Sequence, residues 1–128
     1  MKYYISKMVS SDFDRTVSFV KEALKRSGFG VLSEIDIHKK LKEKLDVDFR
    51  RYKILGACNP QYAYMALLKE DKIGTMLPCN VIVQELGENK TEVAAIDPVA
   101  SMMAVETPGL ETVAGEVKVL LTEVIDSL

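Results

Sequence analysis

Two segments joined by a short turn constrain the fold of this chain most strongly. Residues 79–86 read CNVIVQEL and residues 90–97 read KTEVAAID, with Gly-Glu-Asn between them. Both segments are rich in residues that favour strands, and a three-residue connection containing glycine is typical of an antiparallel β-hairpin. The rest of the chain must therefore be compatible with an antiparallel sheet built around this hairpin.

The remaining segments alternate between strand and helix patterns. Further strands are expected at residues 2–9, 29–37 and 50–58. In the first helix Phe13, Val17, Val20 and Leu24 recur at helical spacing, and Gly28 ends it. The spacing of Ile37, Leu41 and Leu45 predicts a short helix over 38–45.

Two later helices have start signals in the sequence. Asn59-Pro60 predicts a capped start for the segment QYAYMALLKE, with Ala63, Ala66 and Leu67 facing the core. Thr107-Pro108 is expected to cap the last helix in the same way. Its apolar stripe is formed by Leu110, Val113, Val117, Leu120, Leu121 and Val124. We therefore expect Leu120→Ala to destabilise the protein far more than Lys118→Ala.

The resulting order is β-α-β-α-β-α-β-β-α, which predicts an α+β two-layer sandwich. In this fold a largely antiparallel sheet carries helices packed on one face. The length of 128 residues fits a single domain over 1–128.

Composition and charge exclude several function classes. The net charge of −2 and the absence of tryptophan provide neither a basic field nor an aromatic groove for nucleic acid. No apolar run approaches the roughly 20 residues that cross a bilayer. Two cysteines without a secretory signal predict a cytoplasmic protein. We expect no nucleic-acid partner and no membrane association.

The two cysteines define the candidate site: Cys58, Asn59, Cys79 and Asn80. Each cysteine precedes an asparagine and lies within two residues of a proline. We expect Cys58 and Cys79 to lie on near-adjacent strands, with their Cα atoms within about 10 Å. The two cysteine-asparagine pairs would then form one rim. Both thiols can simply be small core residues. Alternatively, the start of a helix after Cys58 favours a thiolate, and the pair could support redox or soft-metal chemistry.

The chain offers few other groups for chemistry. His38 is its only histidine, and zinc sites require three or four Cys or His ligands. We therefore predict no metal and no cofactor, and we assign no catalytic residue. Whether the protein is an enzyme stays open at this stage.

The ordered segments GFGVLSEIDI, YKILGACNPQYAYMAL and MLPCNVIV resemble the bacterial and archaeal family catalogued as domain of unknown function 302. The resemblance runs from the first expected helix to the last. It implies an α+β fold and a homodimer, and it implies no activity.

Three functional hypotheses follow. The first is a non-enzymatic module that binds a small ligand or a partner, with a pocket between the sheet and the irregular segment 98–108. The second is a thiol-based redox or soft-metal-handling protein that uses Cys58 and Cys79. The third is a structural dimer that performs no chemistry.

Overall fold

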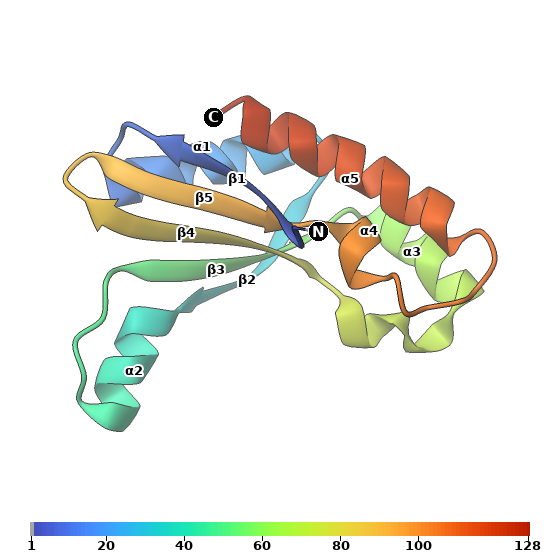
Figure 1. Cartoon of the computed structure of the whole chain (residues 1–128), viewed down its shortest axis with the longest axis horizontal. Helices are drawn as coiled ribbons and strands as arrows, with labels where there is room; N and C mark the ends of the chain where they lie inside the picture. The colour runs from blue at the N-terminus through green and yellow to red at the C-terminus, as the bar shows by residue number, and fades with distance from the viewer. Residues whose placement is uncertain (1) are drawn as a thin grey trace.

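The computed structural model describes residues 2–128, which form an antiparallel sheet with its main helices on one face (Figure 1). The strands are β1 (Tyr4–Val9), β2 (Gly30–Asp36), β3 (Tyr52–Cys58), β4 (Cys79–Gly87) and β5 (Lys90–Ile96). The helices are α1 (Phe13–Arg26), α2 (Ile37–Leu45), α3 (Pro60–Lys69), the 3-10 helix η1 (Asp71–Met76), α4 (Pro98–Ser101) and α5 (Leu110–Asp126). The predicted α+β fold is confirmed, with η1 and α4 as additional short helices.

The sheet has the strand order β1-β5-β4-β3-β2, and every neighbouring pair is antiparallel. The expected hairpin is present as β4 and β5. Its turn is tighter than predicted, because Gly87 already pairs with Lys90 and only Glu88 and Asn89 lie between them. Asn89 has a φ of 49°, a left-handed conformation that asparagine tolerates better than most residues.

Helices α1 and α5 cover one face of the sheet and form the core with it. Along the central strands the residues directed toward these helices are fully buried: Leu55, Val81, Val83 and Val93. The predicted apolar stripe of α1 is confirmed, because Phe13, Val17, Val20 and Leu24 are all buried in the same cluster. In α5 the buried positions include Leu121 and Val124, whereas Leu120 is only partly buried.

The start of α5 differs from the prediction. The helix begins at Leu110, after Gly109, whose φ of 86° is in the left-handed region. Thr107 lies before this start and does not cap the helix. Its Oγ1 donates instead to Glu70 Oε2 at 2.9 Å, which ties the loop to the end of α3.

Helix α3 also packs differently from the expectation. Ala66 is buried, but Leu67 is 42% exposed, so its predicted place in the core is wrong. The reason is the position of α3 at one end of the sheet, where it packs against α5 and η1. A helix in this position buries a narrower strip than a helix lying across a sheet.

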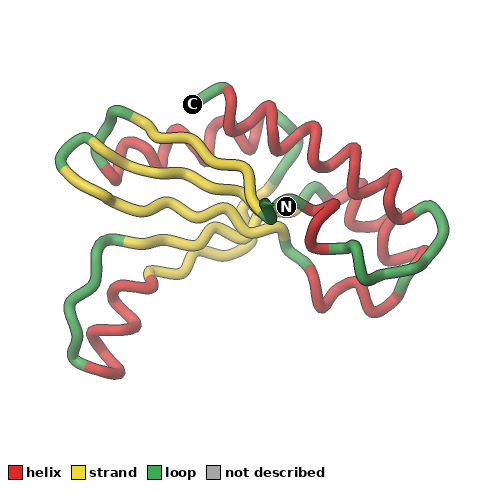
Figure 2. The backbone as a smooth tube through the Cα atoms, viewed as in Figure 1, coloured by secondary structure: helices red, strands yellow, loops and turns green. Residues whose placement is uncertain are grey.

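Helix α2 lies away from the other helices, beside the ends of β2 and β3 (Figures 1 and 2). Residues 37–45 all fall within the described part of the chain, and none of them is buried. The apolar residues Ile37, Leu41 and Leu45 of this helix are therefore not part of a buried core.

Candidate functional site

Cys58 and Cys79 lie next to each other where β3 ends and β4 begins. In the antiparallel register Cys79 lies opposite Ala57, and Ala57 directly precedes Cys58 in β3. Both cysteines are free, and both line one internal cavity. Asn59 and Pro78 also line it, and Pro98 and Met102 close it from the side of α4.

The size of this cavity limits what it can hold. Its volume is about 30 Å³. A single water requires about 10–15 Å³ measured in this way, whereas small-molecule pockets generally reach several hundred. The cavity that Pro98 and Met102 of segment 98–108 close over the two cysteines is therefore too small for a metabolite. Two larger hollows border the same segment and open to solvent. One of about 380 Å³ lies between η1 and residues 104–106, and one of about 280 Å³ lies between Ser101 and the sheet residues Asn80 and Ile96.

Burial has a clear effect on one of the two thiols. It raises the pKa of Cys79 from 9.0 to about 11, and the nearby Cys58 adds to the shift because two thiolates would repel each other. Cys79 is therefore a protonated thiol at neutral pH. A protonated thiol is a poor nucleophile and a poor metal ligand.

Asn59 occupies the N-cap position of α3, as the sequence indicates, but its side chain makes no capping hydrogen bond among the described residues. Its Nδ2 instead donates to the backbone oxygen of Ser27 at 3.5 Å. The same atom lies 3.2 Å from the position that a Cβ on Gly28 would occupy. Asn59 thus links the start of α3 to the end of α1.

Asn80 does not join the other three candidate residues. It pairs with Gly56 in the sheet, it is exposed, and it does not line the cysteine cavity. Successive residues of a strand point to opposite faces, so Asn80 lies on the face away from Cys79. The expected rim of two cysteine-asparagine pairs is therefore divided between the two faces of the sheet.

Among residues 2–128, no helix comparable to α1 or α5 covers the face that carries Asn80, and we call this face the open face. It is formed by Tyr4, Ile35, Tyr52, Ile54, Asn80, Ile82, Gln84, Glu92, Ala94 and Ile96. A shallow hollow of about 340 Å³ lies on it, with Tyr3 at its border. The alternation of residues along β3 and β4 predicts that these residues and the core residues lie on opposite faces of the sheet. It does not predict which of the two faces the helices leave uncovered.

Ile35, Ile54, Ile82 and Ala94 form an apolar row across the open face. They lie in direct cross-strand register on four successive strands, from β2 to β5. A polar chain follows the neighbouring row. Arg50 Nε donates to Gln84 Oε1 at 2.8 Å, and Gln84 Nε2 donates to Glu92 Oε1 at 2.7 Å. The open face therefore combines an apolar row with satisfied polar groups.

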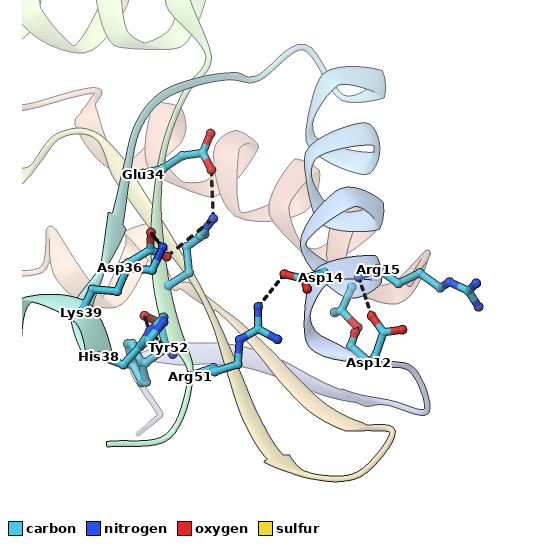
Figure 3. A network of polar contacts seen from close by, with 11 residues as sticks. Asp12, Asp14, Arg15, Glu34, Asp36, His38, Lys39, Arg51 and Tyr52 are labelled. Atoms are coloured by element: carbon cyan, nitrogen blue, oxygen red, sulfur yellow. Dashed lines mark hydrogen bonds and ion pairs between the residues drawn. The ribbon is translucent and has the colours of Figure 1, made fainter. Parts of the chain in front are cut away.

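The segment between β2 and β3 is held by polar contacts at its base (Figure 3). His38 Nδ1 accepts a hydrogen bond from the backbone N–H of Tyr52 at 3.0 Å. The Arg51 guanidinium donates to Asp14 at 2.6 Å and lies over the ring of Phe13. These contacts fix where the segment leaves the sheet, while its outer residues remain exposed.

Two further observations concern metals and membranes. Within residues 2–128, no three His, Cys, Asp or Glu side chains come together as metal ligands would. In the same part of the chain, no helix is both long enough and apolar enough to cross a membrane.

Comparison with known proteins identifies similar chains. The model of the family described as domain of unknown function DUF302 matches residues 5–128. A solved structure described as uncharacterized conserved protein DUF302 from Bacillus stearothermophilus has a TM-score of 0.90 and 29% sequence identity, and the match covers 98% of each chain. No curated protein matches this chain. The resemblance expected from the sequence is confirmed.

Proposed function

Since the chain belongs to the family described as domain of unknown function DUF302, we propose a function from its geometry: it is a non-enzymatic binding module that acts as a homodimer through its open face. The observation that carries this proposal is the apolar row of Ile35, Ile54, Ile82 and Ala94. Antiparallel sheets commonly leave one face to water, and that face then carries mainly polar side chains. Here the uncovered face is apolar along its centre, as expected of a surface that another protein covers.

A second copy of the chain is the partner that this surface fits best. Two identical faces related by a twofold axis place each apolar row against its own equivalent, with no other partner required. Sheets that pack face to face in this way bury their facing side chains in a shared layer about 10 Å thick. The polar chain through Gln84 and Glu92 would then lie beside the apolar centre of the interface.

A small ligand, if the module binds one, belongs on the same face. The cysteine cavity of about 30 Å³ excludes a metabolite, whereas the open-face hollow has about 340 Å³. Three tyrosines, Asn80 and Glu92 border this hollow and provide both aromatic surface and hydrogen-bonding groups. A second copy would cover the hollow, so a ligand bound there would be enclosed between two subunits.

The experiment that tests the proposal is native mass spectrometry with light scattering over a dilution series. Wild type is expected to be a dimer that dissociates on dilution. Ile82→Asp introduces a charge at the centre of the open face and should raise the dimer Kd by about tenfold or more. Val119→Asp, on the exposed side of α5, is the control and should leave Kd unchanged. Circular dichroism verifies that both variants fold, and Ile82→Thr, which keeps the β-branched shape, provides a milder second test.

Two outcomes would contradict the proposal. One is a wild-type protein that stays monomeric at high concentration. The other is a dimer that Ile82→Asp and Val119→Asp weaken equally. The wild-type spectrum also reports any small molecule retained by the dimer.

A thiol function is the second candidate, and the shared cavity is the observation that favours it. Cys58 and Cys79 line the same space on adjacent strands. With hydrogen peroxide as oxidant, Cys58 would form a sulfenic acid and release water. Cys79 would then attack the sulfenic sulfur, form the disulfide and give its proton to the departing hydroxide, which leaves as a second water. The raised pKa of Cys79 makes this step slow at neutral pH. Peroxide-treated protein should lose the mass of two hydrogens if this reaction occurs. Unchanged mass would exclude the redox function, and a parallel titration with copper(I) tests soft-metal binding.

A further inference from the structure

The segment between β2 and β3 suggests how a second copy would be held, and we call residues 37–51 the arm. It consists of α2 and an extended loop that returns to β3, and both lie apart from the other helices (Figure 2). Leu45, Val47 and Phe49 are exposed although they are large and apolar. Three such residues within five positions form an exposed apolar edge on the arm.

The arm is anchored to the sheet rather than loosely attached. His38 at its beginning bonds to the backbone of Tyr52, and Arg51 at its end bonds to Asp14 (Figure 3). The ring of Phe49 lies 6.2 Å from that of Tyr52, a residue of the open face. The apolar edge of the arm is therefore continuous with the open face of its own subunit.

Charge complementarity indicates a second copy as the partner of the arm. The arm contains six lysine or arginine residues and three acidic residues, a net charge of +3. The whole chain has a net charge of −2, so the residues outside the arm, which we call the body, have a net charge of −5. An identical chain therefore offers an acidic body to a basic arm, and the contact can be made twice in a symmetric dimer.

The area required for a stable dimer supports the same conclusion. Five strands about 4.8 Å apart and about 20 Å long present roughly 500 Å² on the open face. Stable interfaces bury about 800 Å² on each partner. A nine-residue helix about 13 Å long, together with its loop, adds roughly 200–300 Å². The sheet face alone is too small, and the face together with the arm, roughly 700–800 Å², comes close to the area of a standard interface.

We infer that the arm of each subunit lies against the body of the other subunit and clasps it beside the open face. This inference rests on the proposed homodimer and adds the element that holds it together. Leu45, Val47 and Phe49 would be the apolar contacts. Lys40 and Lys42 pair with Glu43, Asp46 and Asp48 of their own arm, so Lys44 is the arm lysine that would face carboxylates of the partner.

A matched pair of variants tests the inference. Leu45 on the arm and Leu68 on α3 are exposed to almost the same extent, 66% and 69%. Leu45→Asp should raise the dimer Kd by about tenfold or more, because it places a charge in an apolar contact. Leu68→Asp should leave Kd unchanged. Neither leucine contributes a buried side chain to the subunit, so both variants should fold with unchanged circular dichroism.

Hydrogen exchange on the wild-type protein provides a test without mutation. The amides of residues 45–49 and of β4 should both become more protected as the protein concentration rises through the dimer Kd. The inferred arm contact is wrong if β4 alone gains protection, or if Leu45→Asp and Leu68→Asp change the dimer Kd equally. Either result would still be compatible with a dimer through the open face. A wild-type protein that is monomeric at every concentration overturns both proposals.

Discussion

At the scale of single residues, the sequence draws attention to two cysteine-asparagine pairs that the structure places in different surroundings. Cys58, Asn59 and Cys79 lie around one small cavity, whereas Asn80 lies on the open face. The difference follows from strand alternation: Cys79 and Asn80 are consecutive in β4 and so point to opposite faces. Asn59 follows β3 and turns with the chain into α3, so it stays near the cavity.

The raised pKa of Cys79 predicts a pH-dependent stability. The folded protein binds this proton more tightly than the unfolded chain, because the pKa rises from 9.0 to about 11. The stabilisation is therefore fully present below pH 9 and is lost as the pH rises toward about 11. Its full value is on the order of 2–3 kcal/mol. Urea unfolding between these pH values measures it.

Cys79→Ala is the control for this pH dependence. The loss of stability between pH 9 and pH 11 should be smaller in the variant than in wild type. The rate of alkylation at Cys79 in native protein should also rise only as the pH approaches 11. Rapid alkylation of Cys79 at neutral pH would show that the thiol is neither buried nor protonated as described.

Gly56 gives a second prediction at this scale. A Cβ at this position would overlap Ser33 Oγ and lie 2.9 Å from the Pro78 ring. The serine hydroxyl can rotate, but the proline ring cannot, so we expect Gly56→Ala to cost about 1–3 kcal/mol. Gly115→Ala is the matched control, because a Cβ there meets nothing within 4 Å. In a helix that change should stabilise by up to about 1 kcal/mol. Equal unfolding free energies for the two variants would contradict the prediction.

At the scale of elements, the contact between α4 and α5 shows a role that helical periodicity cannot reveal. Asp97 is buried, and its carboxylate accepts from the amides of Val99 and Ala100 at the start of α4. Lys118 of α5 pairs with it at 2.9 Å. Burial acts to raise the pKa of Asp97, but the hydrogen bonds from Lys118 and the two amides outweigh it, so the pKa is lowered.

This pair changes the expectation for Lys118→Ala. Lys118 lies off the apolar stripe, but its removal leaves a buried carboxylate with one partner fewer, at a cost of about 1 kcal/mol. The effect should be present at neutral pH and should disappear as the pH falls through the lowered pKa of Asp97, when the carboxyl becomes neutral. Glu116→Ala, an exposed change on the same helix, is the control for urea unfolding at both pH values.

Leu121→Ala tests the buried side of α5. Leu121 is fully buried, whereas Leu120 is only partly buried. Leu121→Ala should therefore cost about 2–5 kcal/mol and Leu120→Ala clearly less. If Leu120→Ala lowers the free energy of unfolding in urea more than Leu121→Ala does, Leu120 rather than Leu121 faces the core, which would contradict the structure.

The sequence was informative where local patterns decide the structure and uninformative where packing decides it. The hairpin and the apolar stripe of α1 follow from turn chemistry and helical spacing, and both were predicted. The exposure of Leu67 depends on where α3 lies relative to the sheet, which residue spacing does not contain. The separation of Asn80 from Cys79 follows from strand alternation and could be predicted from the sequence, whereas the face that α1 and α5 cover could not. The open face could be located only from the tertiary structure.

At the scale of the whole molecule, the uneven distribution of charge predicts how the dimer responds to salt. A basic arm against an acidic body is an attraction between charges near the surface, and salt screens it. Dimer Kd should therefore rise several-fold between low and high ionic strength. For Leu45→Asp the rise should be smaller, because the arm contact is already weakened. A Kd that falls with salt would indicate an interface held by apolar contacts alone.

The position of β1 in the sheet has a consequence for the order in which the protein can fold. This strand pairs with β5, and its Tyr4 lies opposite Ile96, so the partners are 92 positions apart in the chain. During synthesis at about 5–20 residues per second, the first strand of the described chain therefore waits roughly 5–20 s for its partner. In that interval Ile5 and Val9, which later pack against the core, lie on a strand whose partner has not yet been made. The ribosome thus makes β1 long before β5, although β1 can join the sheet only after β5 has emerged. The nascent chain must keep β1 from pairing with another strand during this time.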